Sequence, residues 1–305
     1  MNKKTVQRRI RSVRNTRKIT KAMELVAGAK MRKATDAVLA SRPYVEALRG
    51  VVGSIAKQAD VSLHPLLRKS EDRERVLVIL IMSDRGLCGG YNVQMTRQMR
   101  QFLARHAEGA AVDVITIGKR AAHAARQLKL NVLEHYTELG ADPKVESLRP
   151  IVRSIITGYA DGTFDDVFIG YTDFQSAIRQ MAVVAAFLPL SKMHEGFGSV
   201  GEHLYDEEAR AKSGEVEKAR EYVFEPSAKQ ILDQALMRII ESMTYQALLE
   251  AVASEHAARM MAMRNATDAA AEMIDTLTLI YNKARQAGIT QEIAEISGGA
   301  AALEG

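Results

Sequence analysis

The chain has 305 residues, enough for two ordinary domains or for one domain joined to an extended element. Hydrophobic residues make up 47% of it, which suffices for a buried core, but aromatic residues make up only 5%, as expected for helices rich in Ala, Met and Leu. The single cysteine, Cys88, excludes an internal disulfide and fits a reducing compartment. The purely apolar run over residues 76–82 is too short to span a bilayer, and the charged N-terminus lacks the apolar segment of a signal peptide.

Positive charge is concentrated at the N-terminus. Residues 1–33 carry twelve Lys and Arg against one acid, Glu24, whereas the remaining chain carries 30 basic and 36 acidic residues. Such a segment could bind nucleic acid, act as a cleavable transit peptide, or face acidic protein loops. An apolar stripe of helical spacing runs through it, and no nucleic-acid-binding module accompanies it, so we favour a surface facing an acidic protein partner.

The N-terminal stripe predicts a helix over residues 3–59. Its apolar or small members recur at steps of three and four, and Arg17 and Lys30 interrupt the stripe. The members are Val6, Ile10, Val13, Met23, Ala27, Ala34, Val38, Ser41, Val45, Leu48, Val52 and Ile55. Pro43 lacks a backbone donor, so we expect a kink or local loosening there rather than the end of the helix.

The middle of the chain reads as alternating strands and helices. Strands are predicted over residues 76–83, 112–117, 131–136 and 167–172, with an edge strand over 183–190, and helices over 92–106, 119–129 and 145–159. This alternation predicts a mostly parallel, doubly wound sheet. Residues 191–225 carry Gly, His and dense charge, which predicts a loop with one short exposed helix over 206–222.

Two glycine-rich stretches raise the question of a nucleotide site. Residues 196–201 match GxGxxG, but they follow the last strand instead of the first, so we interpret them as a loop. Residues 83–92 follow the first strand but lack a phosphate-binding lysine, and we favour a turn held by Asp84 and Arg85 over a phosphate loop. Cys88 has no neighbouring histidine that would make it a nucleophile, and no metal-binding spacing of Cys or His occurs.

A second long helical pattern closes the chain. Residues 227–287 contain neither proline nor glycine, and Gly288 follows them as a predicted end. Small or apolar residues recur at Leu232, Leu236, Ile239, Met243, Ala247, Ala251, Ser254, Ala258, Met261, Ala266, Ala269, Met273, Leu277, Ile280, Ala284 and Ala287. A helix of this length, roughly 90 Å at 1.5 Å per residue, needs a partner of similar length. The simplest arrangement is an antiparallel coiled coil of the two chain ends.

Several segments resemble the gamma subunit of the rotary ATP synthase. They are residues 14–24 (RNTRKITKAME), 29–33, 41–44, 84–90 (DRGLCGG), 253–260 (ASEHAARM) and 281–292 (YNKARQAGITQE), and the similarity extends to the tail at 295–302. The resemblance implies an antiparallel coiled coil of the N- and C-terminal helices with a Rossmann-like insert. We therefore expect three segments: a helix over 1–59, an α/β domain over 60–225 with a charged loop at 191–225, and a helix over 226–305.

The resemblance also implies a function and partners. The chain would be the central-stalk rotor subunit, catalysing nothing itself, without cofactor or metal, and turning inside a ring of alpha and beta subunits. The insert would contact the epsilon subunit and the membrane ring. Contacts with the beta subunit carry over to the following residues: Lys18, Lys21, Met23, Lys30, Arg32, Lys33, Arg259, Arg285, Gln286 and Thr290. Basic side chains suit acidic loops, and small apolar residues near the tip suit an apolar bearing.

Two features in which the sequence differs from known family members narrow the type of organism and compartment that we expect. Residues 191–222 are longer and more charged than in the simplest bacterial members, and the paired cysteines of the chloroplast proteins are absent. With no transit peptide apparent, we expect a bacterial subunit held peripherally at the cytoplasmic side of the inner membrane. The alternatives are a nucleotide-binding α/β enzyme and a basic coiled-coil protein that binds nucleic acid.

Overall fold

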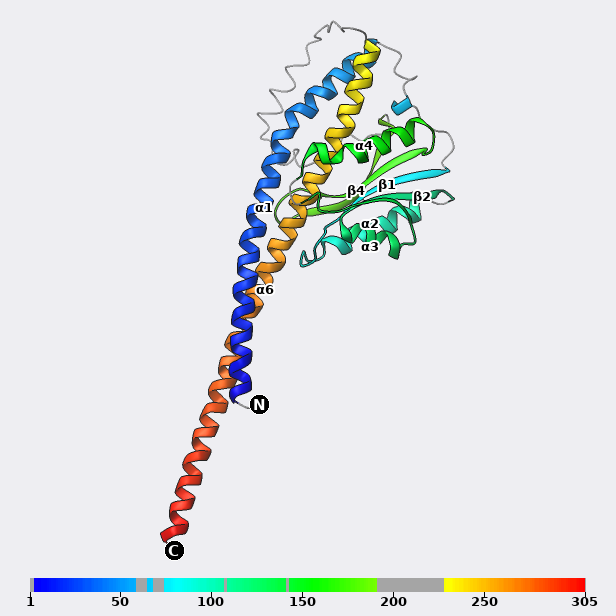
Figure 1. Cartoon of the computed structure of the whole chain (residues 1–305). Helices are drawn as coiled ribbons and strands as arrows, with labels where there is room; N and C mark the ends of the chain where they lie inside the picture. The colour runs from blue at the N-terminus through cyan, green and yellow to red at the C-terminus, as the bar shows by residue number, and fades with distance from the viewer. Residues whose placement is uncertain are drawn as a thin grey trace. The chain divides into compact units, whose positions relative to one another are not determined.

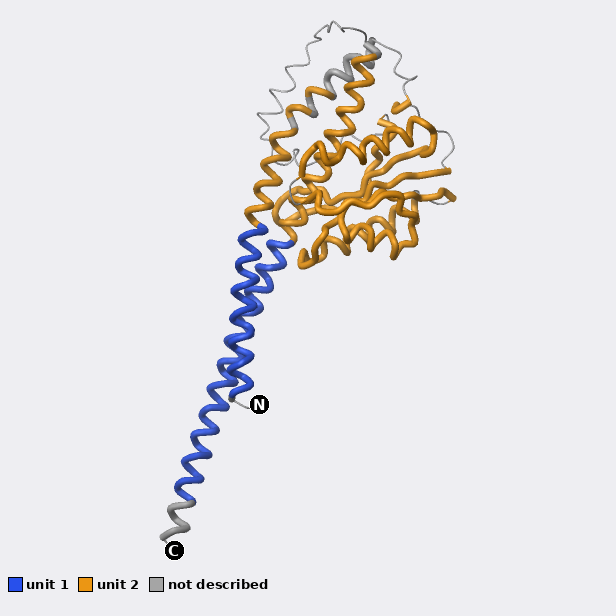
Figure 2. The backbone as a smooth tube through the Cα atoms, in the orientation of Figure 1, with its two compact units in different colours: residues 1–27, 259–305 blue, residues 28–258 orange. Residues whose placement is uncertain are grey.

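The computed structural model describes residues 3–58, 65–67, 74–106, 109–140, 143–190 and 228–304 (Figure 1). The chain forms two compact units, one made of residues 1–27 and 259–305 and the other of residues 28–258 (Figure 2). Both units contain part of each long helix, so the predicted division at residues 59 and 225 stays a prediction. The elements in order are α1 (Lys3–Gln58), η2 (Pro65–Leu67), β1 (Arg75–Ile81), α2 (Tyr91–His106), β2 (Ala111–Ile117), α3 (Lys119–Gln127), β3 (Asn131–Tyr136), α4 (Val145–Ala160), β4 (Asp166–Phe174), β5 (Gln180–Leu188) and α6 (Ala228–Glu304).

The two long helices confirm the helical patterns, with one correction. Helix α1 continues through Pro43 to Gln58, as predicted. Helix α6 extends to Glu304, so it continues past Gly288, where the stretch without proline and glycine had by itself predicted an end. A glycine inside a helix costs only about 1 kcal/mol relative to alanine, and no proline follows Gly288 to stop the helix.

The unit of residues 28–258 contains a five-stranded sheet in the order β3-β2-β1-β4-β5. The first four strands are parallel, and β5 pairs antiparallel with β4 at one edge, which confirms the predicted edge strand. Strand β1 is central and buried from Val76 to Ile81, because helices cover both faces of a parallel sheet and keep water away from its central strands.

Helices cover both faces of this sheet, with α4 on one side and α2 and α3 on the other (Figure 1). The side chains of β1 alternate between two cores. Leu77, Ile79 and Ile81 belong to a cluster with α4 and α6, whereas Leu80 packs with Met95 of α2 and residues of α3. The predicted doubly wound, Rossmann-like fold is confirmed.

Two expectations concern features beyond this architecture. The charged loop at 191–225, with its short helix and the GxGxxG stretch, lies outside the described residues. Within the part of the chain that the structure describes, no helix is both long and apolar enough to cross a membrane.

Candidate functional site

The unit of residues 1–27 and 259–305 is an antiparallel helix pair with a heptad seam. On α1, seam residues follow at alternating steps of four and three, and on α6 the same spacing recurs. The seam residues with buried side chains include Val6, Ile10, Thr20 and Ala27 on α1, and Met263, Thr267, Ala270, Ile274 and Leu277 on α6. Val6 and Ile10 cluster with Ile274 and Leu277, so the start of α1 packs against a late part of α6. This spacing is the signature of a coiled coil.

The α6 seam differs from the predicted one. Ala269, Met273 and Ile280 were expected in the seam, but they are exposed. The buried residues are instead Thr267, Ala270 and Ile274, because a seam between two supercoiled helices repeats every 3.5 residues, whereas the predicted stripe followed the slower period of a straight helix.

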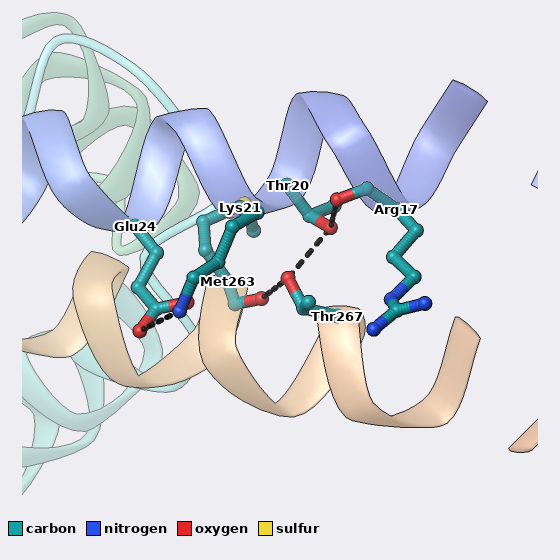
Figure 3. Close-up of polar contacts among 6 residues, drawn as sticks. All are labelled: Arg17, Thr20, Lys21, Glu24, Met263 and Thr267. Carbon is teal, nitrogen blue, oxygen red and sulfur yellow. Dashed lines mark hydrogen bonds and ion pairs between the residues drawn. The ribbon is translucent and has the colours of Figure 1, made fainter. Parts of the chain in front are cut away.

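A polar pair lies inside this seam (Figure 3). The hydroxyls of Thr20 and Thr267 lie 2.8 Å apart, and the two residues are only 9% and 7% exposed. Each hydroxyl also lies within hydrogen-bond reach of a carbonyl of its own helix, that of Arg17 at 3.1 Å for Thr20 and that of Met263 at 2.8 Å for Thr267. The two hydroxyl protons are shared among these three contacts. The threonine that donates to the other threonine therefore cannot also donate to the carbonyl of its own helix.

Charged residues flank the pair on α1. Arg17 and Glu24 stand three residues before and four residues after Thr20, at the next seam positions. The Glu24 carboxylate accepts a hydrogen bond from the Lys21 ammonium at 3.0 Å, within the same helix (Figure 3). Lys21 is half exposed, so this ion pair adds at most about 1 kcal/mol. The apolar seam is therefore interrupted from Arg17 to Glu24, and Thr20 supplies the cross-helix contact there.

The predicted contact residues are distributed over both units. In the helix pair, Lys18, Lys21, Arg285, Gln286 and Thr290 are exposed, and Met23 is half-buried. Arg259 departs from the prediction of an accessible cation, because it is only 9% exposed. In the other unit, Lys30, Arg32 and Lys33 are exposed on α1.

Lys18 and Lys21 belong to a basic groove, whose cations all come from the positively charged N-terminal segment noted in the sequence. The groove has a volume of about 1630 Å³ and lies along α1 and α6 of the helix pair. Its cationic lining residues are Lys4, Arg8, Arg11, Arg14, Arg17, Lys18 and Lys21. Asp268 is the single acid in the lining. This surface attracts acidic groups. In the sequence, the cations of α1 recur every three to four residues, which already indicates that they lie on one side of the helix.

The end of α6 carries an apolar stripe that the sequence analysis missed. Ile289, Ile293 and Ile296 recur at steps of four and three and are 47%, 58% and 72% exposed. From Asn282 to Gly298 every residue is exposed except the half-buried Ala284 and Gly288. Large isoleucines, more than Ala and Met, therefore form the apolar surface of this end.

In the glycine-rich turn after β1, Asp84 bonds to distant backbone groups instead of the local ones predicted, and the role of Arg85 stays a prediction. The Asp84 carboxylate accepts hydrogen bonds from the Lys119 amide at 3.0 Å and from the Glu138 amide at 2.9 Å. Cys88 is buried next to Asn92, whose amide donates to its sulfur at 3.2 Å. Among the described residues no cluster of His, Cys, Asp or Glu could hold a metal ion.

Comparisons with known proteins agree on one family. The family model described as ATP synthase matches residues 2–303. The ATP synthase gamma chains of Stenotrophomonas maltophilia strain K279a and of Xanthomonas oryzae pv. oryzae strain PXO99A are each 42% identical over 299 residues, covering 98% of both chains.

Solved structures share the fold. A chain of the mitochondrial ATP synthase of Euglena gracilis, in a structure of OSCP, F1 and c-ring, aligns over 99% of this chain and 94% of its own length, with a TM-score of 0.62 and 19% identity. A chain of the central stalk and c-ring structure from Tetrahymena thermophila aligns over 81% and 99%, with a TM-score of 0.58 and 22% identity. Together with the full-length sequence relatives, these findings establish that the chain belongs to the ATP synthase gamma chain family.

Proposed function

We propose that this chain is the central-stalk rotor of a proton-translocating ATP synthase and couples rotation to ATP synthesis at the beta subunits. The helix pair turns inside a ring of alternating alpha and beta subunits. An eccentric rod gives each surrounding subunit a different set of contacts, and such differences shift conformational equilibria. In this function the chain itself is a non-catalytic subunit.

One observation carries the proposal: the helix pair buries its own seam, yet its outer surface still offers a basic groove and an apolar stripe. The groove is lined by seven cations, and Ile289, Ile293 and Ile296 expose their side chains along the end of α6. A groove of this charge suits acidic loops, and a stripe of this kind suits an apolar bearing. A surrounding ring of subunits meets both requirements.

The contacts with the beta subunit are assigned from the family motifs. Lys18, Lys21, Lys30, Arg32 and Lys33 offer exposed ammonium or guanidinium groups on α1, and Arg285, Gln286 and Thr290 offer exposed polar groups on α6. Met23 is half-buried and Arg259 is buried, so these two act at the margin of the surface or through their neighbours.

The α/β unit serves as the foot of the rotor in this proposal. It contacts the epsilon subunit and the membrane ring, and the whole subunit is held peripherally at the cytoplasmic side of the bacterial inner membrane. The relatives from Stenotrophomonas and Xanthomonas support a bacterial setting. The nucleotide-binding enzyme and the nucleic-acid-binding protein lose their support, because the sequence relatives are gamma chains over their full length.

The test compares two exposed cations near the end of α6 in the assembled complex. Arg285→Ala removes a proposed beta contact, and Lys283→Ala removes a cation two residues away, on another side of the helix. Loss of one surface charge costs less than about 1 kcal/mol, so both variants should assemble. We expect Arg285→Ala to change the rate or the protons pumped per ATP hydrolysed, and Lys283→Ala to match the unaltered complex.

Two results would contradict the proposal at different levels. Unchanged rate and coupling in Arg285→Ala would remove this residue from the mechanism. Purification of the unaltered chain without alpha and beta subunits would refute the rotor function itself.

A further inference from the structure

The carboxyl edge of the sheet is filled by the chain's own C-terminal helix. In a doubly wound sheet, ligands bind at the carboxyl ends of the two neighbouring strands where the chain reverses its direction of winding. With the order β3-β2-β1-β4-β5, these strands are β1 and β4. Residues 245–254 of α6 contact this edge, within the unit of residues 28–258.

Two hydrogen bonds fasten α6 to the edge. Tyr91, the first residue of α2, donates its hydroxyl to the Ala251 carbonyl at 3.2 Å. Ser254 donates its hydroxyl to the Thr172 carbonyl of β4 at 3.0 Å. All four of these residues are buried, so water does not compete for the bonds.

The connection between β3 and α4 meets the same part of α6. A Cβ atom at Gly140 would lie 3.1 Å from the Val252 side chain, and the Tyr245 hydroxyl lies 3.4 Å from the Pro143 carbonyl. Four residues of this stretch, Ala247, Ala251, Ala253 and Ser254, are small and fully or nearly fully buried. Small side chains let the helix backbone approach the sheet edge closely.

We propose that this edge is a mechanical grip, which holds α6 where related folds hold a ligand and transmits torque between the α/β unit and the helix. This inference rests on the proposed rotor function. Apolar packing is non-directional and tolerates sliding, whereas hydrogen bonds fix direction. Ala251 and Ser254 lie one turn apart on α6 and bond to α2 and β4, so the two bonds together oppose both sliding and rotation of the helix. Tyr91 and Ser254 are thus positioning residues.

The experiment uses the assembled ATP synthase in inverted membrane vesicles. The test variant is Tyr91→Phe with Ser254→Ala, which removes both hydroxyls and little volume. The matched control is Tyr44→Phe with Ser147→Ala, which makes the same chemical changes at exposed positions of α1 and α4. ATP hydrolysis and proton pumping are measured while the opposing proton gradient is raised, and amide exchange is measured over residues 251–258.

We expect the test variant to pump protons normally against a small gradient. As the gradient rises, the number of protons pumped per ATP hydrolysed should fall, because a weakened contact between α6 and the sheet edge gives way only at high torque. Its amides over 251–258 should exchange at least about fivefold faster, because the loss of one such hydrogen bond already predicts that factor. The control should match the unaltered complex in both measurements.

Faster exchange with unchanged pumping at the highest gradient would overturn the inference, because the hydroxyls would then be only local supports. Unchanged exchange and unchanged pumping would overturn it as well. Neither result touches the proposed rotor function, which fails only if the unaltered chain does not assemble with alpha and beta subunits. Should the double variant fail to assemble, Tyr91→Phe alone gives the same comparison with Tyr44→Phe.

Discussion

The Thr20–Thr267 pair allows a quantitative test of what holds the two helices together. Valine matches threonine in shape and nearly in helix propensity, so Thr→Val changes chiefly the hydroxyl. In Thr20→Val, Thr267 still donates to the Met263 carbonyl, so no donor is left without a partner. The cost is therefore the net value of the cross-helix bond, about 1 kcal/mol, and Thr267→Val should cost about the same because Thr20 keeps the Arg17 carbonyl.

The double variant should cost no more than either single one. Replacing both partners of a buried hydrogen bond by apolar groups of the same shape is nearly neutral, and two valines suit a heptad seam. The predicted coupling energy between the two threonines is therefore about 1 to 2 kcal/mol in magnitude. Amide exchange over residues 16–27 and 263–270 measures the free energy of local opening, which avoids assuming that the whole chain unfolds in one step.

Thr16→Val provides the control, since Thr16 is exposed and its hydroxyl donates to the Ser12 carbonyl of its own helix, at 3.2 Å. It should change the opening free energy by less than about 0.5 kcal/mol. If the two single costs simply add in the double variant, to within about 0.5 kcal/mol, the cross-helix bond contributes nothing and the reasoning fails.

Three further predictions concern the sheet and the end of α6. Burial raises the pKa of Tyr136 from 10.0 to about 12, and its hydrogen bond to the Glu134 carboxylate at 2.7 Å adds to this, so the folded state keeps a proton that the unfolded state loses. The free energy of unfolding should thus fall between pH 10 and about 12, and Tyr136→Phe should remove this part of the fall in urea titrations. Gly118→Ala should destabilise the α/β unit by more than about 3 kcal/mol in thermal unfolding, because φ is +98° and a Cβ would lie 2.1 Å from the Met82 carbonyl oxygen. The control Gly109→Ala should cost only about 1 kcal/mol, because φ is +84° but nothing lies within 4 Å of the added Cβ. Gly288→Ala should slow amide exchange around residue 288, since nothing lies within 4 Å of the added methyl group and alanine favours the helix by about 1 kcal/mol; unchanged exchange would show that this end is not helical in solution.

Much of the fold follows from local patterns in the sequence. Buried parallel strands are short apolar runs between helical stretches, and the apolar run from Val76 to Ile81 was enough to predict β1. The antiparallel pairing of the ends followed from length alone, because no other element could cover stripes of that size.

The details of the seam did not follow, for two physical reasons. Ala and Met occupy several sides of α6, so apolar periodicity cannot distinguish Ala269 and Met273 from Ala270 and Ile274. A threonine in a helical pattern usually indicates the solvent-exposed side of the helix. That Thr20 and Thr267 contact each other becomes apparent only when the two helices are packed together. Arg259 was expected at the surface because the resemblance implied a contact with the beta subunit, but the residue is only 9% exposed.

The end of α6 shows why a helix can continue where its own sequence argues against it. A helix without a packing partner lacks the main source of helical stability, and Gly288, Gly298 and Gly299 each remove about 1 kcal/mol. Burying one isoleucine contributes about 1.5–3 kcal/mol, so covering Ile289, Ile293 and Ile296 outweighs all three glycines. The stability of this segment is therefore decided by what surrounds it. In the proposed rotor, the ring of alpha and beta subunits both stabilises the tip and senses its orientation, because the stripe occupies only one side of the helix.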